Sequence, residues 1–152
     1  MITILEYHDG KAALCRDVLD DLQEWFGLAK AKAAYIAASA ELPMLAGFFD
    51  GQAIGFVSLK PQTDFAVELY VLGVRRAYHR RGVGRALIES AARLASLQGR
   101  LFLTVKTLAP SNPDPNYAAT RRFYEASGFL PIEVFPTLWD ARNPCLLMVR
   151  PL

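Results

Sequence analysis

The segment His79-Arg80-Arg81-Gly82-Val83-Gly84-Arg85 combines two glycines with cationic side chains, a composition suited to holding an anion. A β-prone segment precedes it and an apolar stripe at helical spacing follows it, so we expect it to begin a helix. The first turn of a helix has unpaired backbone N–H groups and a partial positive charge, which together stabilise a phosphate. The glycines let a phosphate approach closely, and the arginines can reach its oxygens. A turn with a solvated basic face is the alternative interpretation.

Two common phosphate-binding loops do not fit this segment. A Walker A loop requires a terminal Gly-Lys-Ser/Thr, which is absent. A dinucleotide-binding loop requires three glycines at the start of a βαβ unit and an acidic residue about 20 positions later, whereas this segment has two glycines flanked by arginines. The remaining interpretation is a loop for another compact phosphate ligand.

The distribution of charge supports a compact ligand. The net charge is only +2, yet the residues from Arg75 to Arg85 include five arginines and one histidine and no acid. The first helical region has the opposite bias, with Asp17, Asp20, Asp21 and Glu24. A local basic patch on a nearly neutral chain favours a small polyanion and argues against a nucleic-acid duplex. The acidic residues could attract a cationic amine, but a solvated charged face is the more common origin of such a pattern.

The elements that position this loop follow from the apolar pattern. Alternating and β-branched segments predict strands at 2–7, 43–49, 53–60, 65–74, 101–105, 129–134 and 146–150. Helical spacing predicts helices at 11–26, 31–40, 83–97 and about 117–126. The strand at 65–74, the helix at 83–97 and the strand at 101–105 form one βαβ unit, so these two strands should be parallel neighbours. The other connections are mainly hairpins, and the predicted fold is mixed α+β.

The loop and a second motif resemble the GNAT acetyltransferase superfamily. The family's acyl-coenzyme A motif, Gln/Arg-x-x-Gly-x-Gly/Ala, follows a strand and opens a helix, as the segment from Glu68 to Leu87 does, with His79 at the Gln/Arg position. The segment from Thr120 to Phe129 resembles the family's helix that ends in a tyrosine, here Tyr124, before Gly-Phe. The resemblance covers most of the chain. It implies one GNAT domain over 1–152, with a mostly antiparallel sheet of about seven strands, one parallel splayed pair and about four helices.

The resemblance implies that acetyl-coenzyme A is the cosubstrate, with its pyrophosphate on the loop. The pantetheine would pair with the strand near Leu72 and Val74, where Gly73 suits a close backbone approach or simply ends the strand. A family asparagine on the later helix corresponds to Tyr117, with Asn116 adjacent. The implied cofactor-binding residues are Leu72, Gly73, Val74, His79, Arg80, Arg81, Gly82, Val83, Gly84, Arg85, Asn116, Tyr117 and Tyr124. Whether the acyl group is acetyl or longer is left open.

The reaction that the resemblance implies is attack of a primary amine on the thioester. An alkylammonium with a pKa of about 10.4 must first lose a proton, which costs about 4–5 kcal/mol at pH 7. Glu68 resembles the glutamate base of part of the family, although an acid at a solvent-facing strand position is an equal alternative. Tyr124 resembles the tyrosine that protonates the departing thiolate, with core packing as its alternative. A strand N–H near Leu72 would polarise the thioester carbonyl.

The acceptor is less well defined. Trp25, Phe26, Tyr35 and Trp139 are candidate acceptor-binding residues, with core packing as an equal interpretation for the first three. We expect the acceptor to be a small-molecule or peptide amine. A non-catalytic acyl-coenzyme A sensor of the same fold, and a nucleic-acid or phosphopeptide binder, are the competing hypotheses. We therefore expect the partner of this chain to be an amine acceptor, and we expect no binding to nucleic acid.

Composition sets the remaining expectations. The chain of 152 residues, 53% hydrophobic, is long enough to bury one core and has no apolar run long enough to span a membrane. Its first residues do not resemble a signal peptide, and Cys15 and Cys145 predict two reduced thiols in a cytoplasmic protein. Because the cysteines and histidines are not clustered, we expect no metal. The oligomeric state is open, although the resemblance makes a homodimer an option.

Overall fold

The computed structural model describes residues 1–152. Its elements follow the order expected from the sequence, with one additional short helix. The strands are β1 (Thr3–Tyr7), β2 (Met44–Phe49), β3 (Gln52–Pro61), β4 (Ala66–Val74), β5 (Phe102–Leu108), β6 (Leu130–Asp140) and β7 (Asn143–Pro151). The helices are α1 (Lys11–Asp20), α2 (Gln23–Phe26), α3 (Ala29–Glu41), α4 (Val83–Leu97) and α5 (Pro115–Ala126), with a 3-10 turn, η1, at Arg76–Tyr78.

The seven strands have the order β1-β2-β3-β4-β5-β7-β6. β4 and β5 are parallel, with Ala66 opposite Phe102 and Glu68 opposite Thr104. The ladders β1–β2, β2–β3, β5–β7 and β6–β7 are antiparallel. The predicted mixed, mostly antiparallel sheet with one parallel pair is therefore confirmed. No helix is both long and apolar enough to cross a membrane.

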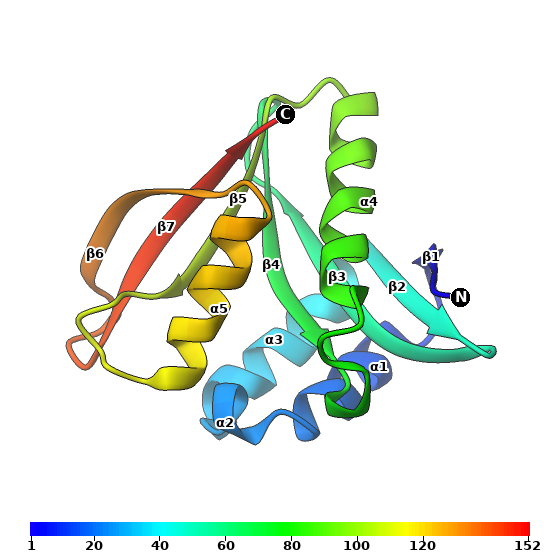
Figure 1. Ribbon diagram of the computed structural model, residues 1–152, viewed down its shortest axis with the longest axis horizontal. Coiled ribbons are helices and arrows are strands. Elements are labelled where there is room, and N and C mark those ends of the chain that lie inside the picture. The colour runs from blue at the N-terminus through cyan, green and yellow to red at the C-terminus, as the bar shows by residue number, and fades with distance from the viewer. The chain divides into compact units, whose positions relative to one another are not determined.

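The chain forms two compact units. Unit 1 contains Met1–Lys60 and Tyr70–Leu94, and unit 2 contains Pro61–Leu69 and Ala95–Leu152. In unit 1 the helices α1, α2 and α3 lie together (Figure 1). One face of α1 is buried against strands β2, β3 and β4, and this core consists of Leu14, Cys15, Val18, Leu19, Leu22, Met44, Ala46, Phe56 and Val71. The predicted apolar stripe of α4 is also buried, including Val83, Leu87, Ile88 and Ala91.

In unit 2 the strands β5, β7 and β6 lie next to one another, and α5 packs against β5 (Figure 1). The buried side chains include Leu103, Val105, Phe129, Cys145 and Met148. The helix α5 begins two residues earlier than predicted, because Asp114 caps it by accepting a hydrogen bond from the Asn116 N–H and Pro115 occupies the first turn. Proline is tolerated there because the N–H that it lacks would have no partner within the helix.

The helix predicted over 11–26 is interrupted after Asp20. The backbone N–H of Arg76 donates to the Asp21 carboxylate at 2.6 Å, and the Arg76 guanidinium donates to the Asp21 carbonyl at 3.0 Å. Leu22, with φ −123° and ψ 50°, leaves the helical conformation, and α2 starts at the next residue. Contacts between residues distant in sequence therefore override a continuous helical pattern.

The last two strands are longer than predicted. Residues between the predicted strands 129–134 and 146–150, including Pro136, Trp139 and Pro144, lie within β6 and β7, which are joined by only a tight turn at Ala141 and Arg142. β6 is the edge strand of the sheet and its ladder with β7 has two register shifts. An edge strand with such irregularities accommodates proline, which explains why Pro136 does not end the strand. The predicted bounds of these two strands, which left Trp139 outside the sheet, are thus wrong.

Gly73 is required by packing within unit 1. A Cβ at this position would lie 2.9 Å from Cγ1 of Val18 and 3.4 Å from both Leu22 Cδ1 and Phe56 Cε1. Both Val18 and Phe56 are fully buried, so neither has room to move. The close approach expected at Gly73 is therefore an approach of α1 to β4.

We predict that Gly73→Ala destabilises the protein by about 1–3 kcal/mol, the usual cost of overpacking a close-packed core. Urea denaturation followed by circular dichroism would measure this loss. Val18→Ala on the Gly73→Ala background should recover part of it, because it removes the clashing methyl group. A Gly73→Ala protein as stable as the wild type would contradict the packing argument.

Candidate functional site

The loop between β4 and α4 has the backbone of an anion site. Arg80 and Gly82 adopt positive φ angles of 61° and 81°. The first backbone hydrogen bond of α4 runs from the Ala86 N–H to the Gly82 carbonyl at 3.0 Å. The N–H groups of residues 83–85 are therefore not used by the helix. A Cβ at Gly82 would meet no atom within 4 Å, which leaves open space beside these groups. A phosphate fits such a cradle.

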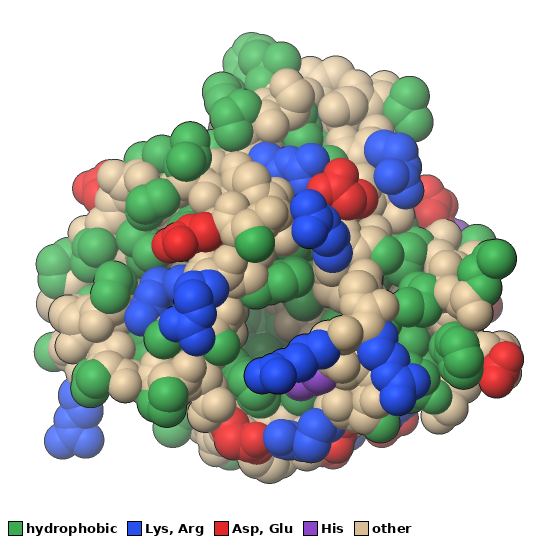
Figure 2. Space-filling view, viewed as in Figure 1, with side chains coloured by type: hydrophobic (Ala, Val, Ile, Leu, Met, Phe, Trp, Pro, Cys, Tyr) green, Lys and Arg blue, Asp and Glu red, His purple; other side chains and the backbone are tan.

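Basic side chains surround this loop. Figure 2 shows Lys and Arg side chains, with a histidine among them, over the region between β4 and α4. Arg80 and Arg85 are exposed and form no ion pair, so both are available to an anion. The Arg81 guanidinium lies over the Tyr78 ring at 5.5 Å. Arg76, in contrast, is bound to Asp21 and Glu24.

His79 is tied to the end of β4. Its Nε2 lies 2.7 Å from the Val74 carbonyl oxygen, which can only accept, so Nε2 must carry a hydrogen. The ring also makes an edge contact with Trp25, with centroids 6.1 Å apart. His79 therefore anchors the start of the loop through Nε2, and its Nδ1 is not used by this hydrogen bond.

The acidic residues near α1 are largely engaged within unit 1. Glu24 forms an ion pair with Arg76 at 2.7 Å, and the Arg76 hydrogen bond lowers the pKa of Glu24. Asp20 pairs with Lys32 at 2.5 Å. The Glu24–Arg76 pair and the Asp21–Arg76 contact attach the α1–α2 turn to η1, whereas the Asp20–Lys32 pair joins α1 to α3. Part of the charged face expected from the sequence is thus paired, while Asp17 is exposed.

The aromatic candidates Phe26 and Tyr35 join a cluster in unit 1. Their rings meet edge to face at 5.7 Å, and Tyr35 also contacts Tyr70 of β4 at 5.4 Å. Lys60 lies over the Tyr70 ring at 5.3 Å. Phe26, Tyr35 and Tyr70 are only partly buried and pack against the core of unit 1. Tyr70 was not singled out from the sequence, because only the contact with α3 distinguishes it from any other strand tyrosine.

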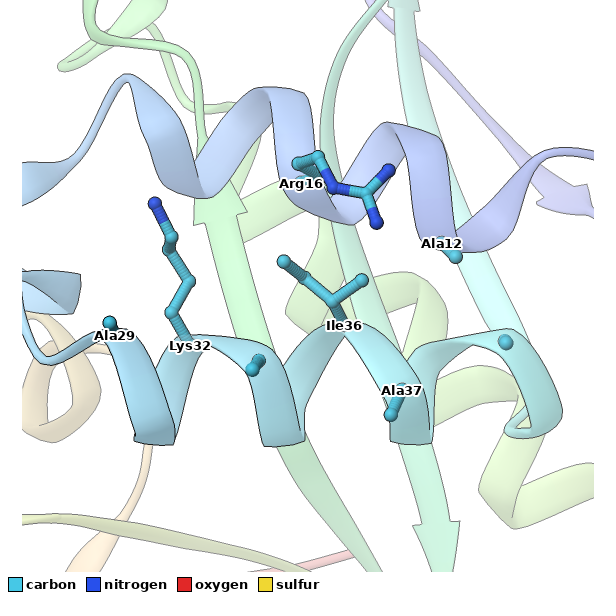
Figure 3. Close-up of a pocket in the computed structure, with 8 residues that line it drawn as sticks. Ala12, Arg16, Ala29, Lys32, Ile36 and Ala37 are labelled. Atoms are coloured by element: carbon cyan, nitrogen blue, oxygen red, sulfur yellow. The ribbon is translucent and has the colours of Figure 1, made fainter.

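A separate groove of about 450 Å³ lies between α1 and α3 in unit 1. Figure 3 shows Arg16 from α1 and Lys32 and Ile36 from α3 along it. The rest of its lining consists of alanines, namely Ala12, Ala29, Ala33, Ala37 and Ala40. None of the site residues predicted from the sequence lines this groove, and it contains no group suited to catalysis.

In unit 2, Glu68 forms an ion pair with Lys106. The Lys106 Nζ lies 3.0 Å from Oε2 of Glu68, whose side chain is 6% exposed compared with 28% for Lys106. The alternative interpretation of Glu68 as a solvent-facing acid is therefore wrong, since its side chain is buried and paired. Lys106 was not predicted from the sequence, because the pairing depends on the register that places Glu68 opposite Thr104.

Tyr124 is also buried in unit 2. It is 7% exposed, and its ring meets Phe129 at 5.5 Å and Phe123 at 5.3 Å. Its backbone carbonyl accepts hydrogen bonds from Ser127 and Phe129 at the end of α5. Asn116 and Tyr117 lie in the first turn of the same helix and are partly buried. The Tyr-x-x-x-Gly-Phe motif thus forms the C-terminus of α5 and its packing onto the sheet.

Comparison with known proteins identifies the family. The sequence matches the model of the acetyltransferase (GNAT) family over residues 12–129. The chain belongs to the GNAT acetyltransferase family. No curated protein sequence matches this GNAT chain.

Solved structures share its fold. A GNAT-family protein from Desulfovibrio desulfuricans has a TM-score of 0.83 at 21% identity, covering 99% of each chain. The ribosomal-protein-S18-alanine N-acetyltransferase from Escherichia coli has a TM-score of 0.78 at 20% identity, covering 99% of this chain and 94% of the other. A GNAT acetyltransferase from Elizabethkingia anophelis with acetyl-CoA bound has a TM-score of 0.73 at 16% identity, covering 99% and 98%. At these identities the likeness establishes the fold alone.

The two cysteines give a testable pH dependence. Burial raises the pKa of both Cys15 and Cys145 above the usual value of 9.0. The unfolded chain therefore ionises these thiols at a lower pH than the folded protein does. The free energy of unfolding should keep this contribution below about pH 8.5 and lose it as the pH rises above that value toward the folded-state pKa values.

Urea denaturation at about pH 7.5 and about pH 9.5 would measure this effect. We expect lower stability at the higher pH. The double variant Cys15→Ala/Cys145→Ala should lose less stability over the same interval, because it has no thiol to ionise. An equal loss in both proteins would assign the pH dependence to other groups.

Proposed function

We propose that this GNAT protein transfers the acetyl group of acetyl-coenzyme A to a primary amine of a small molecule or peptide. The observation that carries the proposal is the loop at the start of α4. It combines backbone N–H groups that the helix does not use, open space at Gly82, and the exposed side chains of Arg80 and Arg85, which form no ion pair. These features fit the pyrophosphate of coenzyme A, since helix N-termini and guanidinium groups are preferred phosphate ligands.

Strand β4 would contribute to substrate positioning beyond the loop. The N–H and carbonyl groups near Leu72 and Val74 suit the amides of the pantetheine arm. A strand N–H near Leu72 would also donate to the thioester oxygen as negative charge develops on it. A protein dipole that is already oriented needs little reorganisation during the reaction, which is why such donors lower the barrier.

Glu68 and Tyr124 are the proposed proton-transfer residues. The incoming ammonium loses a proton to Glu68, directly or through a water, and the resulting amine attacks the acetyl carbon. As the C–S bond breaks, the departing thiolate takes a proton from the Tyr124 hydroxyl, and the nitrogen of the new amide gives up its extra proton to the resulting tyrosinate, directly or through a water. The burial of both side chains favours this role, because a dry environment strengthens their interactions with developing charge.

The acceptor class rests on the aromatic residues of unit 1. Phe26 and Tyr35, together with Trp25, could contact the apolar part of an amine, and cation–π contact suits an alkylammonium. Lys60 over the Tyr70 ring is an example of this interaction within the protein itself. Trp139 of β6 is 43% exposed and thus accessible to an acceptor. A non-catalytic sensor of acyl-coenzyme A is the alternative function.

Release of free thiol from acetyl-coenzyme A separates these two functions. The purified protein would be assayed with polyamines, aminoglycosides, amino acids and peptides with free N-termini, each with coenzyme A binding measured by calorimetry. The transferase should release thiol in an amine-dependent manner. The double variant Arg80→Ala/Arg85→Ala should weaken coenzyme A binding by about tenfold or more, because each charge-assisted bond contributes about 1.5–3 kcal/mol. Binding without thiol release for any amine would favour the sensor.

We predict that Tyr124→Phe lowers kcat by about 10²-fold, in the range usual for loss of a general acid, and leaves acetyl-coenzyme A affinity nearly unchanged. The substitution removes only the hydroxyl and keeps the ring contacts with Phe123 and Phe129. Steady-state kinetics and calorimetry would measure both quantities. Tyr7→Phe, which removes a tyrosine hydroxyl from β1 outside the proposed site, is the control. Unchanged turnover in Tyr124→Phe would remove Tyr124 from the mechanism.

A further inference from the structure

We infer that Lys106 is a positioning residue that holds the Glu68 carboxylate in one orientation as the base. The inference rests on the proposed function, in which Glu68 receives the proton of the ammonium acceptor. Glu68 and Lys106 belong to different strands of unit 2, and the ion pair between them is 3.0 Å long. Lys106 would act through Glu68 and need not touch the acceptor.

The strand register brings the two side chains together. Glu68 lies opposite Thr104 in the parallel ladder between β4 and β5. Side chains two residues apart on a strand point to the same face, so Lys106 projects from the same side of β5 as Thr104. The lysine stem is long enough to reach diagonally across to the neighbouring strand. The contact is thus a consequence of the sheet and does not depend on a mobile loop.

The difference in burial shows which partner needs the other. The Glu68 side chain is 6% exposed, whereas that of Lys106 is 28% exposed. A carboxylate removed from water is costly unless a cation or hydrogen-bond donors compensate for the lost hydration. Lys106 provides that compensation through its contact with Oε2.

Two other polar groups near the Glu68–Lys106 pair, those of Thr104 and Cys145, provide no cation to Glu68. The Thr104 hydroxyl donates to Gln62 at 2.7 Å and so does not serve Glu68. Cys145 is close enough to be affected by both charges, but burial raises its pKa and keeps it a neutral thiol. Lys106 is therefore the cation that pairs with Glu68.

The geometry also leaves an oxygen for catalysis. Lys106 contacts Oε2, and Oε1 is not used by this ion pair. In the proton transfer an N–H bond of the ammonium breaks and an O–H bond forms at Oε1, directly or through a water. One oxygen held by Lys106 fixes the rotation of the carboxyl group, so that the other is presented in one orientation. Such fixing of a reactive group contributes to catalysis by lowering the entropy lost in the transition state.

The experiment compares four variants in the assay with the best amine. Lys106→Met should lower kcat by about tenfold or more, with the KM for acetyl-coenzyme A within about twofold, because the loss concerns the base and not the cosubstrate. Lys106→Arg should recover most of the activity, since it restores a cation at the same place. Glu68→Gln should lower kcat strongly. Adding Lys106→Met to Glu68→Gln should cause no further loss, because Lys106 acts through Glu68.

Two controls separate positioning from stability. Lys106→Met leaves a buried carboxylate without its cation and could unfold the protein, so the double variant, which has no buried charge, shows whether the fold tolerates methionine at this position. Circular dichroism and coenzyme A binding report folding for every variant. Lys32→Met breaks the exposed pair with Asp20, and Glu133→Gln neutralises an acid that lies opposite Leu147, the residue that also faces Lys106. Both controls should keep the wild-type kcat.

The outcomes distinguish this inference from the proposed function. A wild-type protein that binds coenzyme A but acetylates no amine overturns the proposed function and this inference with it. An active wild type with an unaffected Glu68→Gln overturns the role of Glu68 and therefore that of Lys106. A strong loss in Glu68→Gln with a normal kcat in folded Lys106→Met overturns only the present inference. A further loss in the double variant, beyond that of Glu68→Gln alone, would also contradict it.

Discussion

The unpaired N–H groups at the start of α4 are the constraint on which much of unit 1 depends. A helix must leave these groups without partners inside the helix, and a phosphate is among the ligands that satisfy them best. The surrounding contacts all hold this helix start in one place. Val83 is buried beneath it, His79 is bonded to the Val74 carbonyl before it, and Arg76 attaches η1 to the α1–α2 turn. The open space at Gly82 is then available to a ligand.

The ion pairs of unit 1 have a second consequence. The α1–α2 turn carries the aromatic residues proposed to contact the acceptor, and Arg76 binds this turn through both Asp21 and Glu24. The segment that leads into the loop before α4 is therefore connected by these contacts to the segment next to Trp25 and Phe26. The Arg76–Glu24 ion pair contributes only modestly to stability because both side chains are largely exposed. Two hydrogen bonds between Arg76 and Asp21, one to the carboxylate and one to the backbone carbonyl, also hold the turn.

The main polar feature of unit 2 is the buried Glu68 carboxylate, which we propose as the base. Burial removes water from a carboxylate and so disfavours its charged form, although only the charged form can accept a proton. The Glu68–Lys106 pair places a more exposed cation against this buried carboxylate. The same unit buries Tyr124, whose ring contacts Phe123 and Phe129.

Sequence alone determined the features that depend on local pattern. The strand–loop–helix around Gly82, the parallel pair formed by β4 and β5 and the motif ending at Phe129 all followed from periodicity, glycine placement and family resemblance. These are short-range properties, because helix starts, turns and apolar faces are encoded within a few residues. The family assignment therefore needed no knowledge of the packing.

Only the tertiary structure decided which polar groups face one another. The break between α1 and α2 arises from Arg76, more than fifty positions away, and could not be read from a continuous helical pattern. The extension of β6 through Pro136 and Trp139 depends on its being the edge strand. The partner of Glu68 was hidden for the same reason, since strand register is fixed by side-chain packing across the sheet and a shift of one residue would have turned Lys106 to the opposite face.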